Sequence, residues 1–599
     1  MSTYNVFLGD QYYNRKQIDF ILYDVLKAQT LTEYDYFSDY DREQWDMFLD
    51  ATDAFTKEYF FPLLVQMDRE QPELKNGTIR VHPRMREIML KCGEGGYINA
   101  IAKKDAGGLQ MPMTVANAAS FIMGAANYDI TAYPGLTMGA AHLIENFGNQ
   151  NLRDKYLPKM FSGEWQGTMA LTEPGAGSSL SDVVTSAQDI GNGQYKIRGQ
   201  KVFISCGDSD AVDNVIHLLL ARIEGAPAGT KGISLFVVPR QRILLDGTLE
   251  NNDVIPAGVY HKMGYKGAPI AHLVFGENDD CIGTLLGEPH KGLSYMFQMM
   301  NEARISVGLH ATAIASAAYY ASLKYAKERL QGRPISEKDP SKPQVPIIRH
   351  ADVRRLLLAQ KTFVEGALCL ELLCSYYDDM KKVSNGEDYE RYMLILELLT
   401  PVAKSYPAET SCLSTSWALQ CFGGYGFTKD FVAELYYRQT RIHTLHEGTT
   451  AIHGMDLLGR KMMLQGGRAT MLLLQEVMGD IKKVSQYDDL KTYGDTLSKN
   501  LEDLQALMMH LMGVAQKEGS EAFLSDATLF LELFGIIVMG WLWLKMAAVA
   551  KQNIQSEHCR SILLCTQYYY AYEMPKAKGL FVRLRDTTRV TTGDIEDLL

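Results

Sequence analysis

The 599-residue sequence lacks the features of several large protein classes. Its 60 lysines and arginines form no basic block and are outnumbered by 71 acidic residues, which gives a net charge of −11. Because nucleic acids are bound through clustered lysine and arginine, we expect no nucleic-acid partner. Glycine and proline, at 50 and 19 residues, are too few for a collagen-like or low-complexity chain. With 46% hydrophobic residues, the chain can bury a large core.

Cysteine is scarce, and its spacing follows no framework. The nine cysteines are scattered along the chain, and none of them forms a CxxC pair. This pattern predicts buried thiols in a reducing compartment rather than a disulfide scaffold or a zinc site. The first residues resemble neither a signal peptide nor a transit peptide, and the last four, Glu-Asp-Leu-Leu, are no peroxisomal address. We therefore expect a cytoplasmic protein.

Long hydrophobic runs are absent as well. The longest extends from Leu533 to Leu544 and covers 12 residues between Glu532 and Lys545. A membrane-spanning helix needs about 20 such residues. We interpret this run as a core helix and expect no transmembrane segment.

The common catalytic motifs are also missing. The sequence has no GxxxxGK[ST] loop, no GxSxG elbow and no GxGxxG between a strand and a helix. This argues against a kinase, an α/β-hydrolase and a Rossmann dehydrogenase. His446-Glu447 begins like the zinc motif HExxH, but position 450 is a threonine, so that no metal site is predicted.

What the sequence does contain changes in character along the chain. Up to about residue 165 the apolar residues recur at three-to-four spacing, which indicates helices. Short β-rich runs follow up to about residue 285, one of them directly after Gly191-Asn192-Gly193, a hairpin-type turn. Proline is then absent from 347–400 and from 408–574, which favours helices, whereas the four prolines within 331–346 indicate a surface loop.

These changes predict a multidomain α+β protein. We expect five segments: an N-terminal extension (1–40), an N-terminal α-helical domain (41–165), a middle β-barrel or β-sandwich domain (166–285), a helical bundle (286–465) and an additional C-terminal helical domain (466–599).

Four segments are candidates for chemistry, and each also has a plain structural interpretation. LTEPGAGSS (171–179) offers N–H and O–H groups to a polar ring or a phosphate, or is an ordinary tight turn. In GQKVFIS (199–205), Phe203 and Ser205 lie two residues apart and so share one strand face, where they would flank a flat ring or simply fill a core. The glycines of QCFGGYGF (420–427) would let the backbone of this segment come close to a ligand, or they simply form a turn between helices. In HEGTT (446–450) a carboxylate precedes an expected helix start, where Thr449 would otherwise serve as a cap.

Together and in this order, LTEPGAGSS, GQKVFIS, QCFGGYGF and YYRQTRIHTLHEGTT resemble the acyl-CoA dehydrogenase family of flavoproteins. The resemblance runs from about residue 40 to 465 and agrees with the α–β–α order. The N-terminal extension, the short motif Arg329-Leu330-Gln331-Gly332-Arg333 and the residues from 466 onward resemble a larger subfamily. That subfamily includes the 3-methylthiopropanoyl-CoA dehydrogenases and related long-chain acyl-CoA dehydrogenases.

The resemblance implies FAD-dependent α,β-dehydrogenation of an acyl-CoA thioester to the trans-2-enoyl-CoA, as in fatty-acid β-oxidation. Glu447 stands at the position of the family's catalytic glutamate, which takes the α proton while the β hydride goes to the flavin. A carboxylate in a dry cleft suits that task, because desolvation raises its pKa toward the operating pH. Some relatives carry the base immediately before the arginine that matches Arg304. That position is Ala303 here, and Glu302 lies about 100° away around a helix, so that Glu447 is the expected base.

The resemblance also implies contacts with cofactor and substrate. The residues expected to contact FAD in the same subunit are Thr172, Phe203, Ser205 and Thr449, and those expected to reach the FAD of a neighbouring subunit are Arg329, Gln331, Gln420, Gly423 and Gly424. The residues expected to contact the coenzyme A thioester are Ser178, Asn301 and Arg304. The aromatic residue that usually follows the arginine is missing in Arg329-Leu330-Gln331, which leaves the contacts of Gln331 open.

Three functional interpretations remain open. The first is an acyl-CoA dehydrogenase that forms a homodimer and passes its electrons to an electron-transfer flavoprotein. The second is an acyl-CoA oxidase, which gives its electrons to oxygen. The third is a catalytically silent relative that serves as a binding or scaffold protein, against which the presence of Glu447 argues.

Overall fold

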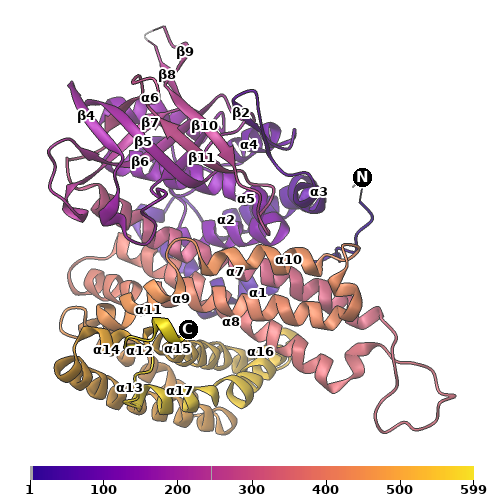
Figure 1. Ribbon diagram of the computed structural model, residues 1–599. Helices are drawn as coiled ribbons and strands as arrows, with labels where there is room; N and C mark the ends of the chain where they lie inside the picture. The colour runs from indigo at the N-terminus through magenta and orange to yellow at the C-terminus, as the bar shows by residue number, and fades with distance from the viewer. Residues whose placement is uncertain (1–3, 245) are drawn as a thin grey trace. The chain divides into compact units, whose positions relative to one another are not determined.

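The computed structural model describes residues 4–244 and 246–599, which divide into two compact units (Figure 1). The first unit contains residues 4–6 and 43–303, and the second contains Phe7–Arg42 and Arg304–Leu599. The expected multidomain α+β fold is confirmed: the first unit combines a helical part with a β-rich part, and the second is helical.

The helical part of the first unit is built around one long buried helix. Its helices are α2 (Arg42–Phe55), α3 (Leu64–Arg69), α4 (Met85–Glu94), α5 (Met113–Phe147) and α6 (Gln150–Phe161). Helix α5 has an apolar surface on nearly all sides and is buried along most of its length, as a core helix must be. It is kinked at Asn127, whose side-chain amide donates to the carbonyl of Phe60.

This part also contains a small hairpin that the helical interpretation missed. Strands β1 (Glu73–Lys75) and β2 (Thr78–Arg80) pair across Asn76-Gly77, and both turn residues have a positive φ. An Asn-Gly pair is the strongest short-range signal for such a two-residue turn. The signal was therefore present in the sequence.

The β-rich part forms an eight-stranded sheet that closes on itself. Its strands are β3 (Trp165–Ala170), β4 (Ser186–Gly191), β5 (Gln194–Ser205), β6 (Asn214–Ile223), β7 (Ile233–Pro239), β10 (Val254–Val259), β11 (Ile270–Phe275) and β12 (Ile282–Leu285), with β8 (Gln241–Ile243) and β9 (Leu249–Asn251) as a separate ribbon. β5 pairs with β12, β12 with β7, β7 with β6, β6 with β4, and β4 with β5, so that the pairing returns to its start. The expected barrel is thereby observed.

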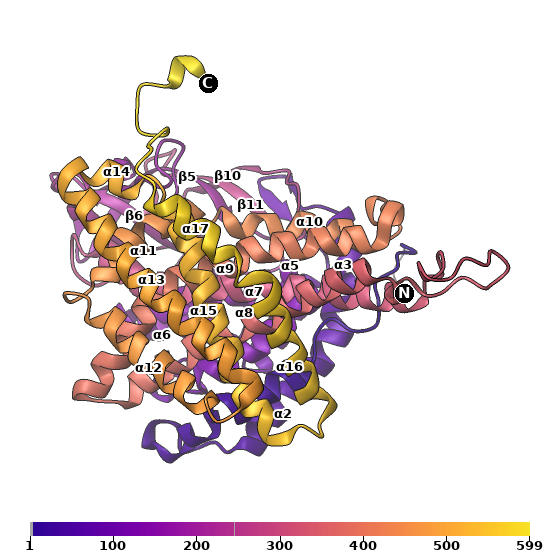
Figure 2. The same cartoon turned by 90° about the horizontal axis from the view of Figure 1, so that it is seen from below.

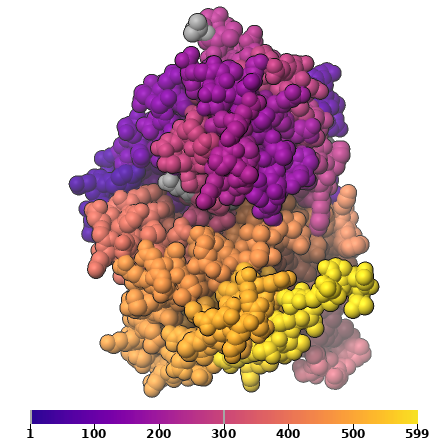
Figure 3. All heavy atoms as spheres, turned by 60° about the vertical axis from the view of Figure 1, so that its left-hand side comes forward, coloured from indigo at the N-terminus to yellow at the C-terminus, as the bar shows by residue number. Residues whose placement is uncertain are grey.

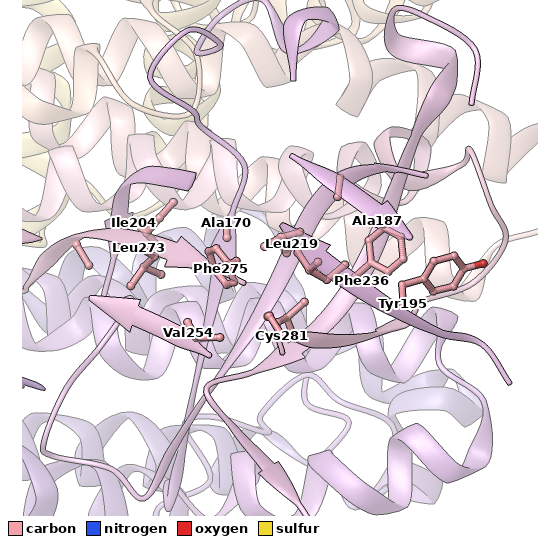
Figure 4. Close-up of a cluster of buried hydrophobic side chains, with 14 of the residues drawn as sticks. Ala170, Ala187, Tyr195, Ile204, Leu219, Phe236, Val254, Leu273, Phe275 and Cys281 are labelled. Carbon is pink, nitrogen blue, oxygen red and sulfur yellow. The ribbon is translucent and has the colours of Figure 1, made fainter. Parts of the chain in front are cut away.

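Side chains that alternate along these strands fill the interior of the barrel. Figure 4 shows Leu219, Phe236 and Phe275 gathered there, with the ring of Tyr195 edge-on to that of Phe236. The turn predicted between β4 and β5 is present, because Gly191 pairs with Gln194 and both intervening residues have a positive φ. Such a turn matches the twist of the strands that it joins.

Long helices form the second unit. They are α1 (Arg15–Asp19), α7 (Gly292–Glu328, which begins in the first unit), α8 (Ala351–Val383), α9 (Gly386–Phe422), α10 (Ala433–Thr440) and α11 (Thr450–Gly459), with the short 3₁₀ turns η10 (Gly423–Phe427) and η11 (Arg441–Thr444). The residues 331–346 form an irregular loop, as predicted. Helices α8 and α9 run side by side (Figures 1 and 2).

The C-terminal helices of this unit surround one apolar helix. They are α12 (Arg468–Val484), α13 (Asp488–Glu518), α14 (Ser520–Leu524), α15 (Ala527–Ala550), α16 (Glu557–Tyr568) and α17 (Lys576–Arg585), and their atoms form the orange-to-yellow surface in Figure 3. Among the described residues, α15 and its C-terminal turn alone are long and apolar enough to cross a membrane, but 83% of the most apolar window is buried in the protein. Helix α15 packs against α8, α9 and α11, as expected for a core helix.

The N-terminal extension belongs to the second unit. The backbone of Phe7 exchanges hydrogen bonds with Asp430 and Val432, at 2.9 and 3.1 Å. The hydroxyl of Ser316 on α7 donates to the carbonyl of Tyr12 at 2.8 Å. These contacts tie the start of the chain to helices that lie hundreds of residues later in the sequence.

Candidate functional site

The loop Leu171–Ser179 follows β3 in the first unit and turns tightly at its centre. The backbone groups of Glu173 and Ala176 exchange hydrogen bonds of 3.0 and 3.1 Å across Pro174-Gly175. The carboxylate of Glu173 accepts the N–H groups of Val184 and Thr185, at 2.8 and 3.1 Å. The segment is therefore a tight turn that these hydrogen bonds hold in place, as its plain structural interpretation predicted.

A buried lysine supports this loop from the neighbouring strand β5. The ammonium of Lys201 donates to the carbonyl of Leu171 at 2.9 Å and to the carboxylate of Glu173 at 2.8 Å. The two charged side chains are 0% and 2% exposed. Burial lowers the pKa of Lys201 to about 8 although Glu173 opposes that shift. For Glu173 burial acts to raise the pKa, but Lys201 and the two amides outweigh it, so that this pKa is lowered.

Phe203 lies two residues further along β5, in an unusual conformation. A β-bulge interrupts the pairing of β5 with β11 at this point, and Phe203 has a φ of 59°. Its ring is 62% exposed and stacks on Tyr260 with 4.6 Å between the ring centroids. A bulky residue with a positive φ stores strain that is often found at ligand sites.

Burial alternates from Val202 to Ser205, a stretch that includes the bulge. Val202 and Ile204 are buried, whereas Phe203 is exposed and Ser205 is half-buried, so that Phe203 and Ser205 share the more open face of the strand. The backbone carbonyl of Ser205 accepts the hydroxyl of Thr168 at 2.6 Å. The N–H of Val202 donates to the carbonyl of Thr172 at 2.9 Å, which brings the 171–179 loop alongside these residues.

The other candidates of the first unit lie on the loop and on α7. Ser178 is exposed on the loop, and Asn301 is half-buried on the helix. Glu302 follows Asn301, and its carboxylate lies 3.0 Å from Nδ1 of His142 on α5. Glu302 is thus paired with His142 within the first unit.

In the second unit, Arg329 and the glycine-rich turn lie close together. The guanidinium of Arg329 lies 5.5 Å from the ring centroid of Tyr425, a residue that the sequence analysis did not single out. Gln420 is exposed near the end of α9, and Gly423 follows the helix with a φ of 61°. A Cβ at Gly423 or Gly424 would meet nothing within 4 Å, so this backbone is open to an approaching ligand. Gln331 is exposed, and its backbone carbonyl oxygen lies at hydrogen-bond distance, 2.8 Å, from Nε2 of His350.

Glu447 lies in the turn between η11 and α11. It has a φ of 53°, and Gly448 follows with a φ of 93°. Two side chains bind the carbonyls of this turn: Nε2 of His453 is 3.0 Å from the oxygen of Glu447, and Nζ of Lys404 on α9 is 2.6 Å from the oxygen of Gly448. The backbone at the expected base is therefore held in a strained, left-handed conformation.

The electrostatic surroundings of Glu447 act in two directions. Burial raises the pKa of its carboxyl, and the positive charges of Arg304 and Lys404 lower it. Burial also lowers the pKa of Lys404 to about 8, opposed by Glu447 and Glu409. A carboxylate whose pKa lies above its ordinary value is suited to accept a proton near neutral pH.

Arg304 is a buried cation on α7. It is only 6% exposed, and its guanidinium lies 3.9 Å from the carboxylate of Asp456 on α11. Burial lowers its pKa, opposed by Asp456 and Glu447. The structure thus joins two predicted site residues, Arg304 and Glu447, in one electrostatic cluster.

Histidines near this cluster are kept neutral. Burial lowers the pKa of His446 and of His453 to about 3, and that of His310 to about 4. Lys404 adds to the effect for both His446 and His453, and Arg304 adds to it for His453. Among these groups, Glu447 is the one whose pKa is shifted upward from the acidic range.

Thr449 stands at the N-cap position of α11, yet its side chain makes no capping hydrogen bond with the described residues. The plain structural interpretation of Thr449 as a helix cap is therefore not supported. Its hydroxyl is left for another partner.

Four family models match successive parts of the chain. "Acyl-CoA dehydrogenase, N-terminal domain" matches residues 42–164, the "middle domain" 168–277 and the "C-terminal domain" 290–463. "Acetyl-CoA dehydrogenase C-terminal like" matches residues 473–593.

Several curated relatives are similar over most of their length. A butyryl-CoA dehydrogenase of Syntrophomonas wolfei is 35% identical over 76% of this chain and 76% of that protein. The 3-methylmercaptopropionyl-CoA dehydrogenase of Ruegeria pomeroyi is 34% identical over 82% and 83%. The broad-specificity linear acyl-CoA dehydrogenase FadE5 of Mycobacterium tuberculosis is 32% identical over 92% and 91%.

Solved structures share the fold. Caenorhabditis elegans ACDH-11, solved in complex with C11-CoA, superimposes with a TM-score of 0.77 over 96% of this chain and 93% of that one, at 19% identity. The butyryl-CoA dehydrogenase of Megasphaera elsdenii gives a TM-score of 0.57 over 69% and 97%, at 23% identity.

Proposed function

Because this chain belongs to the acyl-CoA dehydrogenase family, and is an oxidoreductase of that class, we propose that it oxidises an acyl-CoA thioester to the trans-2-enoyl-CoA with Glu447 as the base. The observation that carries the proposal is the environment of Glu447. Its carboxyl is desolvated, and the positive charges of Arg304 and Lys404 act on it. The backbone carbonyls of Glu447 and Gly448 are both hydrogen-bonded to side chains. Such a group can take a proton from a carbon acid and is held rigidly while it does so.

FAD is the cofactor that the family implies, and the residues present fit it. Phe203 offers an exposed aromatic ring beside Ser205 and Thr172, and the backbone at Gly423 and Gly424 is open to an approaching group. Thr172, Phe203, Ser205 and Thr449 would hold the flavin of the same subunit. When bound, FAD supplies the acceptor for the two electrons and the hydrogen that leave the β carbon of the substrate.

The chain's own residues perform the remaining work. The carboxylate of Glu447 takes the α proton, so that the Cα–H electron pair becomes the π bond of the new Cα=Cβ double bond as the β hydride departs. The N–H of Glu447 would donate to the thioester carbonyl and stabilise the negative charge that develops on it. Arg304, Asn301 and Ser178 would hold the coenzyme A arm.

The partners follow from the same reasoning. Arg329, Gln331, Gln420, Gly423 and Gly424 would complete the FAD site of a second subunit, which makes the protein a homodimer. Electrons would leave the reduced enzyme to an electron-transfer flavoprotein rather than to oxygen.

Relatives named for butyryl-CoA, for 3-methylmercaptopropionyl-CoA and for linear acyl-CoA support a linear acyl chain as the substrate.

Glu447→Gln tests the proposal. The change keeps the volume of the side chain and removes the base, so that flavin reduction should slow by at least about 10²–10⁴-fold. FAD content should stay near one per subunit, and acyl-CoA binding should persist. The measurement is anaerobic bleaching of the flavin absorbance after mixing with a straight-chain acyl-CoA. Reoxidation is then followed with electron-transfer flavoprotein and, separately, with oxygen.

Glu302→Gln is the matched control. Its side chain lies against His142 and can keep a hydrogen bond to that ring, so turnover should be largely retained. If the Glu447 variant bleaches as fast as the unmodified protein, the base is assigned wrongly. If it loses FAD instead, its role is structural.

A further inference from the structure

The turn that carries Glu447 is fixed through two successive backbone carbonyls. The carbonyl of Glu447 faces Nε2 of His453, and the carbonyl of Gly448 faces the ammonium of Lys404. A carbonyl can only accept, so this nitrogen of His453 must carry the hydrogen. Both side chains are fully buried. A Cβ at Gly448 would come within 2.8 Å of Nε2 of His453, so the packing leaves no room for a side chain there.

This arrangement matters because Glu447 has a positive φ. A non-glycine residue in the left-handed region costs of order 1–3 kcal/mol and persists only when its surroundings enforce it. The two carbonyl contacts supply that enforcement. They also leave the N–H groups of the turn available to a ligand, because both side chains bind oxygen atoms.

Lys404 differs from His453 in its charge. Burial keeps His453 neutral, whereas the charge of Lys404 acts directly on Glu447. Lys404 reaches the turn from α9 and lies 44 residues before Gly448 in the chain. Among the described residues it forms no ion pair with a carboxylate; its hydrogen bond goes to the carbonyl of Gly448, and Glu447 is the carboxylate that acts most strongly on its charge.

Resting on the proposed function, we propose that Lys404 is a positioning residue for Glu447, which holds the turn through the carbonyl of Gly448 and keeps the carboxyl group ionised through its positive charge. Without this cation, desolvation would raise the pKa of Glu447 further and disfavour the ionised form that takes the α proton. Arg304 supplies a second cation, whose ion pair among the described residues is with Asp456 on α11 rather than with the backbone of the turn.

Several other groups surround the pair and enter its pH dependence. The charged and titratable side chains near Glu447 and Lys404 in this unit are Arg304 and His310 on α7, Glu409 on α9, His443 and His446 in the preceding segment, and His453 and Asp456 on α11. The four histidines are neutral throughout the neutral range. A change in the titration of Glu447 between pH 6 and 8 therefore reports on the cations.

Lys404→Met tests the charge. The pH profile of flavin reduction should move to higher pH by about one to three units, the range that an opposite charge within a few ångströms produces. The rate at pH 7 should fall at least about tenfold and recover toward pH 9, while the KM for acyl-CoA changes little. Lys404→Arg should restore the pH profile, because it restores the charge.

A second readout does not depend on turnover. A carbodiimide modifies a carboxyl group through its protonated form, so the pH dependence of modification of Glu447, measured by mass spectrometry, reports its pKa directly. This profile should shift upward in Lys404→Met and in Lys404→Gln. Hydrogen exchange in the peptide spanning 445–452 should also be faster in the methionine variant.

Lys361→Met is the matched control. It removes a half-buried ammonium of the second unit, one that pairs with Glu365, and should lower stability without moving either pH profile. If Lys404→Met fails to fold, Lys404→Gln carries the test, because it keeps a donor and removes the charge. Unchanged carbodiimide and kinetic profiles in the Lys404 variants would overturn the proposal. A wild-type protein that no acyl-CoA reduces would refute the proposed function alone, because the carbodiimide profile would still decide the role of Lys404.

Discussion

Breaking the buried pair of Lys201 and Glu173 should open the 171–179 loop, whereas removing both charges should largely spare it. Burial lowers the pKa of Lys201 from its ordinary value of 10.5 to about 8. At 1.36 kcal/mol per pKa unit, this shift amounts to about 3 kcal/mol against keeping the ammonium charged at pH 7. Burial of the charged Lys201 is thus not by itself a source of stability. Removing one partner of such a pair typically costs about 3–5 kcal/mol, because the other charge remains buried.

The assay is hydrogen exchange of peptides covering 171–185 and 194–205. Lys201→Met leaves the carboxylate of Glu173 with only its two backbone amides, and exchange there should accelerate by about 10²–10⁴-fold, the factor that corresponds to that cost. Glu173→Gln should have a similar effect at pH 7. The double variant should lie much closer to the unmodified protein than the sum of the two single changes predicts.

The pH dependence gives an independent check. Because the pKa of Lys201 is lower in the folded than in the unfolded chain, the unfolded state binds more protons between about pH 8 and 10.5, and stability should rise with pH in that window. The pKa of Glu173 is lowered, so its contribution is present above the unfolded pKa and lost as the pH falls through the folded one. Strictly additive single variants, or a loop that exchanges alike in all four proteins, would refute this reasoning.

Two further predictions concern assembly and the membrane. Light scattering should give a homodimer, because Arg329 and the Gln420–Gly424 turn are proposed to complete the FAD site of a second subunit; a monomer with full FAD content would contradict the shared site. Helix α15 should not act as a membrane span, because it is buried among α8, α9 and α11. Membrane-associated protein should therefore be released by salt or alkali, and recovery only with detergent would disprove this.

Local patterns in the sequence predicted much of the fold. Apolar residues change from three-to-four spacing to short β-rich runs and back along the chain, and this order matches the observed order of helices, strands and helices. The Gly191-Asn192-Gly193 turn was predictable because its residues tolerate a positive φ. The Asn76-Gly77 hairpin carried the same signal and was missed because the surrounding helical spacing dominated the interpretation. Helix α9 continues through Pro401 and Pro407, which local reasoning treats as breaks, because its packing against α8 outweighs the lost hydrogen bonds.

The candidate site was predictable only in part. Glu447, Arg304, Phe203 and Ser205 were named from motifs, and the structure joins the first two in one cluster and the last two on one strand face. Lys201 and Lys404 were not named. A lysine within a strand or helix usually lies in solvent, and nothing local indicates that its charge is buried. Their partners lie 28 and 44 residues away in the chain, at a separation that periodicity does not reach.

The two lysines share a role that explains why both are buried. Each sits next to a predicted ligand-facing segment that contains a strained residue: Phe203 with a φ of 59° near Lys201, and Glu447 with a φ of 53° near Lys404. Each donates to a backbone carbonyl of a candidate site loop, that of Leu171 or that of Gly448. A buried ammonium is costly unless every one of its hydrogens finds an acceptor, so it is bound to these carbonyls more firmly than a surface side chain would be. These hydrogen bonds make the loops rigid. They also keep nearby residues in left-handed conformations that a chain without such support would not hold, at the places where cofactor and substrate are proposed to bind.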